Sequence, residues 1–331
     1  MRCAVVGAGA WGTALADLLA TNGHTVRIWA LERDVVASIN ERHENPVFLP
    51  GFKLAESLVA TQDHRETLSG ADLVLYATPS QHLRTIARAG RDHVASAAVL
   101  AVASKGIEQK TLALMSDAVA EEITRRPVVA ISGPSFAVEV AARQPTAIVA
   151  ASMDSDAALV VQDALSSATF RVYTHDDLIG VELGGALKNV MAVATGIVEG
   201  VGLGNNSRAA LITRGLAEMT RLGVALGARA STFAGLAGIG DLVLTCTGAL
   251  SRNRAVGVEV GKGKTLDEAL AGKQTVAEGV ITTKSALALA QREGVEMPIA
   301  TMVYRILFDG LSAKSAVPEL MARGLRAEQD A

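Results

Sequence analysis

The chain has 331 residues, 50% of them hydrophobic but only 3% aromatic, and a formal net charge of -3 at pH 7. This length allows two domains with cores of small aliphatic side chains, and the near-neutral charge gives no electrostatic reason to expect nucleic acid or an anionic membrane as partner. Every charge-free run, residues 93–104 among them, is shorter than the roughly 18 apolar residues of a membrane-spanning helix.

The first half of the chain alternates short apolar runs with helical stretches. Near-continuous apolar strands separated by helices predict a doubly wound parallel sheet that helices cover on both faces. A seventh run, Phe170–Tyr173, is expected at the edge of this sheet. The six other expected strands are Cys3–Val6, Thr25–Trp29, Leu73–Ala77, Val99–Ala103, Val128–Ile131 and Ala147–Ala151.

From about Asp177 onward the hydrophobic period becomes helical. This change predicts an α/β domain over residues 1–176 and an all-helical domain over residues 177–331. The joints "GVGLGNN" and "GLAGIGD" interrupt the helical pattern. The expected helices are Asp177–Glu199, Arg208–Leu226, Leu266–Leu270, Thr282–Glu293 and Ala300–Phe308.

The stretch "VVGAGAWG" places Gly7, Gly9 and Gly12 directly after the first strand, where a helix from Thr13 to Ala20 is expected to open. In the GxGxxG spacing the first two glycines let the backbone turn tightly and approach a pyrophosphate, and the third permits close packing of helix on strand. The strand and helix on either side favour a Rossmann-like domain that binds NAD or NADP. The simpler alternative is that the glycines serve only a tight turn.

Two charges of opposite sign follow the second strand. Glu32 lies at the distance of about 20 residues expected for an acceptor of the ribose hydroxyls of NAD. Arg33 beside it would instead pair with the 2′-phosphate of NADP. Both residues are equally explained as solvated charges at a strand end, so the sequence leaves the choice of cofactor open.

Three small-residue loops, "YATPSQHL", "ASKGIE" and "SGPSFA", follow the third, fourth and fifth strands. An open α/β sheet binds its ligands at this end of its strands. In the second loop Lys105 stands just before Gly106, where it would contact a phosphate or a carbonyl oxygen. The alternative is an ordinary surface lysine.

The stretch "VELGGALKNVMAVATG" predicts a helix that is apolar on nearly every side, yet Lys188 lies in its middle. A buried ammonium without a partner is costly, so proteins seldom keep one without compensation. Asp241 raises the same problem, because it is the lone charge between Ala230 and Ser251. Each charge would compensate the other, either as a structural ion pair or as part of an active site.

The segment "SRNR" follows that long uncharged stretch. Arg252 offers a planar fork and Asn253 an amide, and both groups suit phosphate oxygens. Taken alone, the segment is equally explained as a solvated turn.

Together these residues resemble the bacterial NAD(P)-dependent glycerol-3-phosphate dehydrogenases, which reduce dihydroxyacetone phosphate to sn-glycerol 3-phosphate for phospholipid synthesis. The resemblance extends over nearly the whole chain and implies a Rossmann-like domain followed by a helical one. It rests on nine segments in that family's order, "GAGAWGTALA", "ASKGIE", "GPSFA", "ELGGALKNVMA", "GLGNNSRAALITRGLAEMTRLG", "TFAGLAGIGDLVLTCT", "SRNR", "VAEGV" and "GVEMPI".

The resemblance also implies roles for single residues. Lys188 would be the catalytic proton donor and acceptor, helped by Asp241, and no metal is expected. The residues expected around the substrate are Lys105, Gly133, Ser135, Lys188, Asp241, Ser251, Arg252 and Asn253. The residues expected at the cofactor, with the glycines and Arg33 included, are Gly7, Gly9, Ala10, Trp11, Gly12, Arg33, Lys105, Ala137, Arg252, Val276 and Glu278.

The chain departs from the family at two places. Many relatives have an arginine where this chain has Leu31, and the arginine here is Arg33, so a preference for NADP stays open. The family's "GDNTKAA" is "GNNSRAA" in this chain, with Asn205, Ser207 and Arg208. This change replaces an acid with an amide and keeps the basic residue.

The implied chemistry explains the buried lysine. Hydride transfer to a ketone builds negative charge on the carbonyl oxygen, which a positioned lysine neutralises by donating a proton. Burial lowers the pKa of a lysine and a nearby carboxylate raises it, so Asp241 would help to set the pKa of Lys188. Arg252 and Asn253 would hold the phosphate and thereby orient the reacting carbon.

The sequence also allows two other interpretations. One is a dehydrogenase of similar plan that acts on a 3-hydroxyacid or on 6-phosphogluconate, and the other is a non-catalytic sensor of NAD(P). A cytoplasmic location is expected, because Cys3 and Cys246 form no spaced framework and the N-terminus shows no cleavable signal. A homodimer is compatible with the sequence, which gives no direct sign of it.

Overall fold

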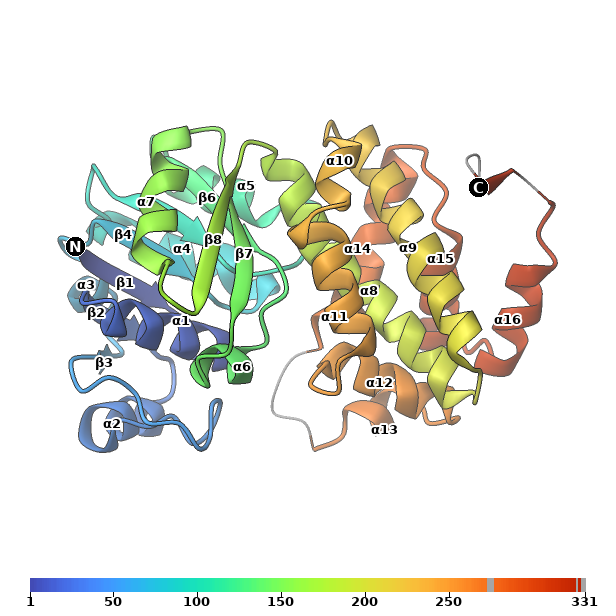
Figure 1. Ribbon diagram of the computed structural model, residues 1–331, viewed down its shortest axis with the longest axis horizontal. Coiled ribbons are helices and arrows are strands. Elements are labelled where there is room, and N and C mark those ends of the chain that lie inside the picture. Colours follow the sequence, from blue (N-terminus) through green and yellow to red (C-terminus); the bar gives the residue numbers. More distant parts are fainter. Residues whose placement is uncertain (273–276, 326, 329–331) are drawn as a thin grey trace. The chain divides into compact units, whose positions relative to one another are not determined.

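The computed structural model describes residues 1–272, 277–325 and 327–328 (Figure 1). The chain divides into two compact units. The first comprises Met1–Lys105 and Ala113–Glu182, and the second comprises Gly106–Leu112 and Leu183–Ala331. The domain boundary that the sequence places between residues 176 and 177 stays a prediction.

The first unit is built on an eight-stranded sheet with the strand order β3-β2-β1-β4-β5-β6-β7-β8. All seven predicted strands are present, and β8 lies at an edge as expected. The short strand β3 at the other edge is not predicted from the sequence. The strands are β1 (Arg2–Val6), β2 (Thr25–Trp29), β3 (Val59–Thr61), β4 (Leu73–Tyr76), β5 (Val99–Val102), β6 (Val128–Ser132), β7 (Thr146–Ala151) and β8 (Phe170–His175).

One strand pair corrects the expectation of a fully parallel sheet. Neighbouring strands are parallel except for β6 and β7, which are antiparallel. Between these two strands the chain forms only the five-residue helix α6 (Ala137–Ala141). Parallel strands need a longer crossover, usually a full helix that returns the chain to the starting edge of the sheet. The short connection therefore reverses the strand direction.

Helices cover both faces of this sheet, which explains why its strands are apolar at nearly every position. In β1, Val5 packs into one core together with Leu15 of α1, while Val6 packs into the other core together with Leu83 of α4. Figure 1 shows α1 and α7 on one face and α4 and α5 on the other. Besides α6, the helices that cover the sheet are α1 (Ala10–Thr21), α2 (Arg33–Arg42), α3 (His64–Leu68), α4 (Leu83–Gly90), α5 (Met115–Glu122) and α7 (Ser155–Leu165), with short 3-10 turns at η1 (Ser80–His82) and η2 (Arg91–His93).

The described residues of the second unit form helices and no strands, as predicted. Several of its short helices are not predicted from the sequence, and most of the predicted helices begin a few residues earlier than expected. The helices from α8 onward are α8 (Leu178–Gly200), α9 (Asn205–Ala225), α10 (Ala230–Phe233), the π-helical turn η3 (Leu236–Gly240), α11 (Asp241–Thr247), α12 (Arg252–Gly261), α13 (Leu266–Leu270), α14 (Glu278–Arg292), α15 (Pro298–Phe308) and α16 (Ala313–Met321).

Two helical stretches are long and apolar enough to cross a membrane by length and composition alone. The apolar window of Leu178–Gly200 is entirely buried by the surrounding protein, and that of Ala230–Thr247 is 44% buried. A helix enclosed by its own protein has the environment of a core helix, so α8 is the core helix that its sequence predicts.

Glycines bring α8 and α12 into direct backbone contact. Each helix has a pair of glycines four residues apart, Gly196 and Gly200 on α8 and Gly257 and Gly261 on α12. A Cβ atom added to Gly196 or to Gly257 would lie 2.1 Å from a backbone oxygen of the facing helix. The two helices therefore approach more closely than any larger residue permits, and α8 carries Lys188 while α12 begins at Arg252.

Two buried carboxylates hold helix starts in place. Glu182 accepts hydrogen bonds from the backbone N–H and the hydroxyl of Ser116, in the first turn of α5, at 2.8 and 2.5 Å. Glu218 accepts from the backbone N–H groups of Ile299 and Ala300, in the first turn of α15, at 2.7 and 3.3 Å. These N–H groups have no partner within their own helix. Burial raises the pKa of each carboxyl group to about 7.

We expect the free energy of unfolding to fall as the pH rises from about 4.5 to about 7, because in this range the unfolded chain releases protons that the folded Glu182 and Glu218 retain. Glu218→Gln does not ionise, so thermal melts between pH 5 and 8 should show a weaker dependence of Tm on pH. Glu41→Gln, at an exposed position of α2, is the control and should keep the wild-type slope. An unchanged slope in Glu218→Gln would contradict the prediction.

Candidate functional site

The loop between β1 and α1 contains glycines that play different parts. Gly7 has a φ of +113°, and a Cβ atom there would lie 2.7 Å from the carbonyl oxygen of Ala77. A Cβ atom on Gly12 would lie 1.9 Å from the carbonyl oxygen of Gly7. By contrast, a Cβ atom on Gly9 would meet no heavy atom of the described residues within 4 Å. The protein's own backbone therefore requires Gly7 and Gly12, whereas the space at Gly9 is open to a ligand.

The start of α1 suits the pyrophosphate of a dinucleotide. The helix begins at Ala10, three residues earlier than predicted, so Ala10 and Trp11 form its first turn. Gly9 is the N-cap, and no described side chain caps this end. Unpaired N–H groups and the positive end of the helix dipole favour an anion. The open space at Gly9 and the uncapped helix start thus fit NAD or NADP.

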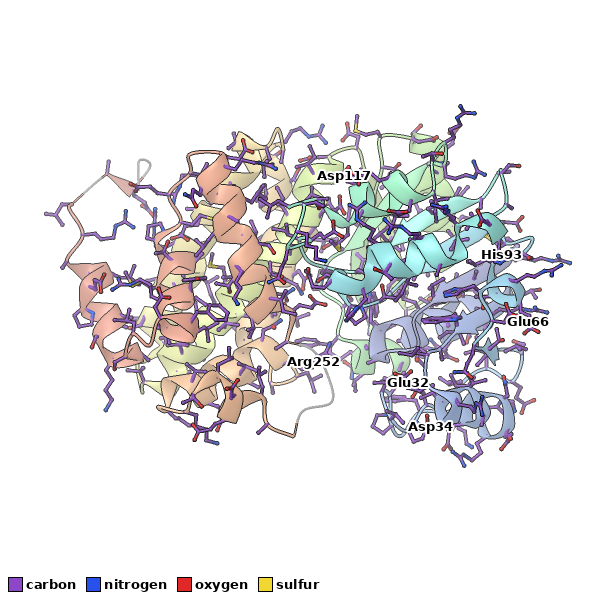
Figure 2. The ribbon with its side chains drawn as sticks, turned by 180° about the vertical axis from the view of Figure 1, so that it is seen from behind. Glu32, Asp34, Glu66, His93, Asp117 and Arg252 are labelled. Atoms are coloured by element: carbon purple, nitrogen blue, oxygen red, sulfur yellow. The ribbon has the colours of Figure 1, made fainter. Side chains whose placement is uncertain are left out.

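The end of β2 leads directly into α2, a helix that the sequence analysis missed. Glu32 is the half-buried N-cap of this helix, and Arg33 is its exposed first residue. Figure 2 shows Glu32 and Asp34 together at this helix start. Leu31, at the position of the relatives' arginine, is 68% exposed. The structure therefore presents charges of both signs here, and Arg33 is exposed to solvent.

The loops after β5 and β6 bring three predicted residues together. The ammonium group of Lys105 and the hydroxyl of Ser135 both donate to the carbonyl oxygen of Gly133, at 3.0 and 2.9 Å. Gly133 has a φ of +132°, which favours glycine, and a Cβ atom there would lie 3.0 Å from the backbone of Ile148. Lys105 is half-buried, and Ala137 begins α6 in the same loop region.

Lys188 is buried in the second unit, where its ammonium group bonds to charged and polar side chains. Only 7% of its surface is exposed. Its ammonium group donates to Oδ1 of Asp241 at 2.5 Å and to the hydroxyl of Thr245 at 2.9 Å. Thr245 lies one helical turn after Asp241 in α11 and also donates to the Asp241 carbonyl oxygen at 2.7 Å. The predicted pairing of Lys188 with Asp241 is thus present.

Thr245 is not predicted as a site residue from the sequence, although its spacing of four residues from Asp241 places both on one face of a helix. The approach of α11 to α8 also depends on glycine. A Cβ atom on Gly184 would lie 2.4 Å from the carbonyl oxygen of Ala237, in the π-helical turn that leads into α11. The "GLAGIGD" joint therefore turns the start of α11 toward the lysine.

The segment "SRNR" is the start of α12 rather than a turn. Ser251 is its N-cap and accepts from the backbone N–H of Arg254 at 3.3 Å. Asn253 is buried. Its amide nitrogen donates to Oδ1 of Asn189 on α8 at 2.8 Å, and its oxygen accepts from the backbone N–H of Gly279 on α14 at 2.9 Å. Asn253 thus joins three helices, and Asn189 is a further residue that the sequence analysis left without a role.

Arg252 is exposed at the first position of α12. Figure 2 labels it at this helix start. Its guanidinium interacts electrostatically with Glu278, the first residue of α14. Arg254 donates to both carboxylate oxygens of Glu199 at the end of α8, at 3.0 and 2.8 Å. This bidentate pair holds α12 beside α8. Val276, predicted at the cofactor, lies outside the described residues.

The remaining polar and titratable side chains give no sign of a metal site or of a reactive thiol within the described residues. Within the described residues no three His, Cys, Asp or Glu side chains gather as metal ligands do. Burial raises the pKa of Cys3 and of Cys246 to about 12, which makes both thiols poor nucleophiles. At the start of α9, Arg208 donates to Oδ1 of Asn205 at 2.5 Å. The amide that replaces the family's acid therefore still accepts a hydrogen bond from the basic residue.

Comparisons with known proteins agree with this geometry. The model of the NAD-dependent glycerol-3-phosphate dehydrogenase N-terminus matches residues 2–158, and that of the C-terminus of the same enzyme matches residues 177–318. A glycerol-3-phosphate dehydrogenase (NAD(P)+) from Citrifermentans bemidjiense is 53% identical over 330 residues, which are 99% of this chain and 98% of that protein. The chain belongs to the NAD-dependent glycerol-3-phosphate dehydrogenase family.

Further relatives support the same family. A glycerol-3-phosphate dehydrogenase (NAD(P)+) from Syntrophotalea carbinolica is 52% identical over the whole of both chains. The crystal structure of glycerol-3-phosphate dehydrogenase from Coxiella burnetii has a TM-score of 0.94 and 42% identity, covering 97% of this chain and 99% of that one. Membership in the glycerol-3-phosphate dehydrogenase family makes the chain an oxidoreductase that uses NAD or NADP, and it decides against the other dehydrogenases and the non-catalytic sensor.

Proposed function

We propose that this chain reduces dihydroxyacetone phosphate to sn-glycerol 3-phosphate with NADH or NADPH, reversibly, and that Lys188 is its acid and base. The observation that carries the proposal is a buried lysine bonded to Asp241 and Thr245 in a member of this family. The glycerol 3-phosphate so formed serves phospholipid synthesis.

Lys188 performs the proton transfer in this scheme. When bound, the nicotinamide would supply a hydride to the carbonyl carbon. Lys188 donates its proton to the carbonyl oxygen, which becomes the hydroxyl of the product, and takes up another proton from solvent. In the reverse direction the neutral amine accepts the hydroxyl proton. Asp241 stabilises the charged form of the lysine, and Thr245 orients its ammonium group.

The start of α12 binds the substrate phosphate. Arg252 is exposed at its first position, where its planar guanidinium can form two parallel hydrogen bonds to phosphate oxygens. Ser251 and Asn253 flank it, and the positive end of the helix dipole adds to the attraction. Binding energy from the phosphate then orients the carbonyl group for reaction.

The loops of the first unit carry further residues that we propose to bind ligands. Lys105 and Ser135 both donate to the carbonyl oxygen of Gly133 at the carboxyl end of the sheet, where open α/β sheets bind their ligands. We therefore propose that these three residues contact the substrate and that Lys105 also contacts the cofactor. The glycine loop and the first turn of α1 would hold the cofactor. The other residues proposed to contact it are Arg33, Ala137, Arg252, Val276 and Glu278.

We further propose a cytoplasmic homodimer. Apolar side chains, among them Leu203, Val224 and Met321, are exposed in and beside a groove of about 1180 Å³ formed by α9, α15, α16 and the chain around them. Contiguous exposed apolar surface of this kind marks contacts between proteins, and a second copy of the chain would cover it. Sedimentation analysis measures the oligomeric state directly, and a monomer at micromolar concentration would rule the dimer out.

Lys188→Met should lower kcat by at least about 100-fold, because the variant lacks the proton donor. NADH should still bind, since the glycine loop is unchanged. The carboxylate of Asp241 would stay buried but lose its ion pair with Lys188, so the double variant with Asp241→Asn provides a form without that charge. Lys262→Met, at an exposed position after α12, is the matched control. Near-normal kcat per folded molecule in Lys188→Met would refute the catalytic role.

Arg252→Lys keeps the positive charge but loses the planar fork, so we expect kcat/KM for dihydroxyacetone phosphate to fall by about 10-fold or more. Unphosphorylated dihydroxyacetone should be a very poor substrate of the wild type and nearly indifferent to the substitution. Steady-state assays of both substrates on both proteins test this. An equal loss of kcat/KM for the two substrates would show that Arg252 does not bind the phosphate.

The cofactor preference depends on the start of α2. We expect activity with both NADH and NADPH, because Glu32 and Arg33 present opposite charges near the adenosine ribose. Arg33→Ala should therefore raise the KM for NADPH more than the KM for NADH, since only NADPH carries the 2′-phosphate. Arg42→Ala, at the exposed far end of the same helix, is the control. Equal changes in KM for the two cofactors would show that Arg33 does not contact the 2′-phosphate.

A further inference from the structure

A buried amide contacts the glycine loop from a distant part of the sequence. Asn45 follows α2 and has no exposed surface. Its amide nitrogen donates to the carbonyl oxygen of Ala8 at 2.8 Å and to the hydroxyl of Thr13 at 2.8 Å. Its oxygen accepts from the backbone N–H of Phe48 at 3.1 Å. Both N–H bonds of this amide are therefore directed at the loop and at the helix that follows it.

Thr13 closes the network. Its hydroxyl accepts from Asn45 and donates to the carbonyl oxygen of Ala8 at 3.1 Å. The Ala8 oxygen thus receives two hydrogen bonds from side chains that are fully buried. A satisfied buried network of this kind is rigid, because every alternative arrangement leaves a polar group unpaired.

The network determines which way the next N–H points. In a trans peptide the C=O and the N–H lie on opposite sides of the bond. The oxygen of Ala8 is held toward the protein interior by Asn45 and Thr13. The N–H of Gly9 must then face away from them, on the outer side of the loop. None of the backbone hydrogen bonds between described residues uses this N–H.

We propose that Asn45 and Thr13 are positioning residues for the cofactor, which hold the Ala8–Gly9 peptide so that the Gly9 N–H donates to the pyrophosphate of NAD or NADP. The inference rests on the proposed binding of the cofactor at this loop. An N–H that is already oriented loses no freedom on binding, so a charge-assisted hydrogen bond to the phosphate contributes its full strength.

Thr13→Val and Thr13→Ser form the matched pair that tests this role. Valine keeps the shape of threonine but removes the hydroxyl, whereas serine keeps the hydroxyl. The probes are ADP-ribose, which contains the pyrophosphate, and adenosine, which does not. Calorimetry measures Kd for ADP-ribose, and competition measured by NMR gives Kd for adenosine. Asn45→Asp, which keeps the acceptor for Phe48 but loses both donors, is the second variant.

We expect Thr13→Val to raise the Kd for ADP-ribose about 10-fold and the Kd for adenosine less than 2-fold. Thr13→Ser should bind both ligands nearly as tightly as the wild type does. Asn45→Asp should raise the Kd for ADP-ribose at least as much as Thr13→Val does. The amide proton of Gly9 should move downfield when ADP-ribose binds to the wild type, and less in Thr13→Val. Should Asn45→Asp not fold, the Thr13 pair still decides.

Two results would overturn the inference. One is equal affinity of Thr13→Val and Thr13→Ser for ADP-ribose. The other is an equal loss of affinity for ADP-ribose and for adenosine in Thr13→Val, which is the result that a purely structural role produces. A different result would refute the proposed site as a whole. If wild-type protein binds ADP-ribose no more tightly than adenosine, the pyrophosphate does not lie at this loop.

Discussion

The ion pair between Lys188 and Asp241 is the constraint on which the second unit depends. Both groups are almost completely buried, and each would be costly in that environment without the other. The 2.5 Å contact joins residues 53 positions apart, so α8 and α11 must be held side by side with little freedom. The proposed chemistry has the same requirement, because a proton donor is effective only when it is held at the reacting oxygen.

Glycine is the means by which the helices come close enough. α8 meets η3 at Gly184 and α12 at Gly196, and in each place an added Cβ atom would collide with a backbone carbonyl. A third contact is Gly279 on α14, whose Cβ atom would lie 2.4 Å from the carbonyl oxygen of Asn189. The elements that carry Asp241, Arg252 and Glu278 therefore all pack directly on the helix that carries the lysine. The glycine-rich joints of the sequence are packing surfaces as well as turns.

The first unit works in a different way, since much of its proposed ligand surface is backbone. The glycine loop and the first turn of α1 present N–H groups, and the loops after β5 and β6 gather around the carbonyl oxygen of Gly133. Backbone groups take their direction from whatever holds the peptide planes. The buried side chains of Asn45 and Thr13 hold one such plane, and so they affect a surface that they do not reach.

The sequence by itself determined the α/β and helical halves, seven of the eight strands, the glycine loop, and the candidate pair Lys188 and Asp241. These depend on local signals: hydrophobic period, glycine spacing, and an isolated charge in an apolar stretch. Only the tertiary structure decided that β7 runs antiparallel to β6, that Thr245 and Asn189 complete the polar contacts, and that Asn45 supports the glycine loop. The side-chain contacts among these join residues 37 to 64 positions apart, and only the folding of the chain makes those residues neighbours.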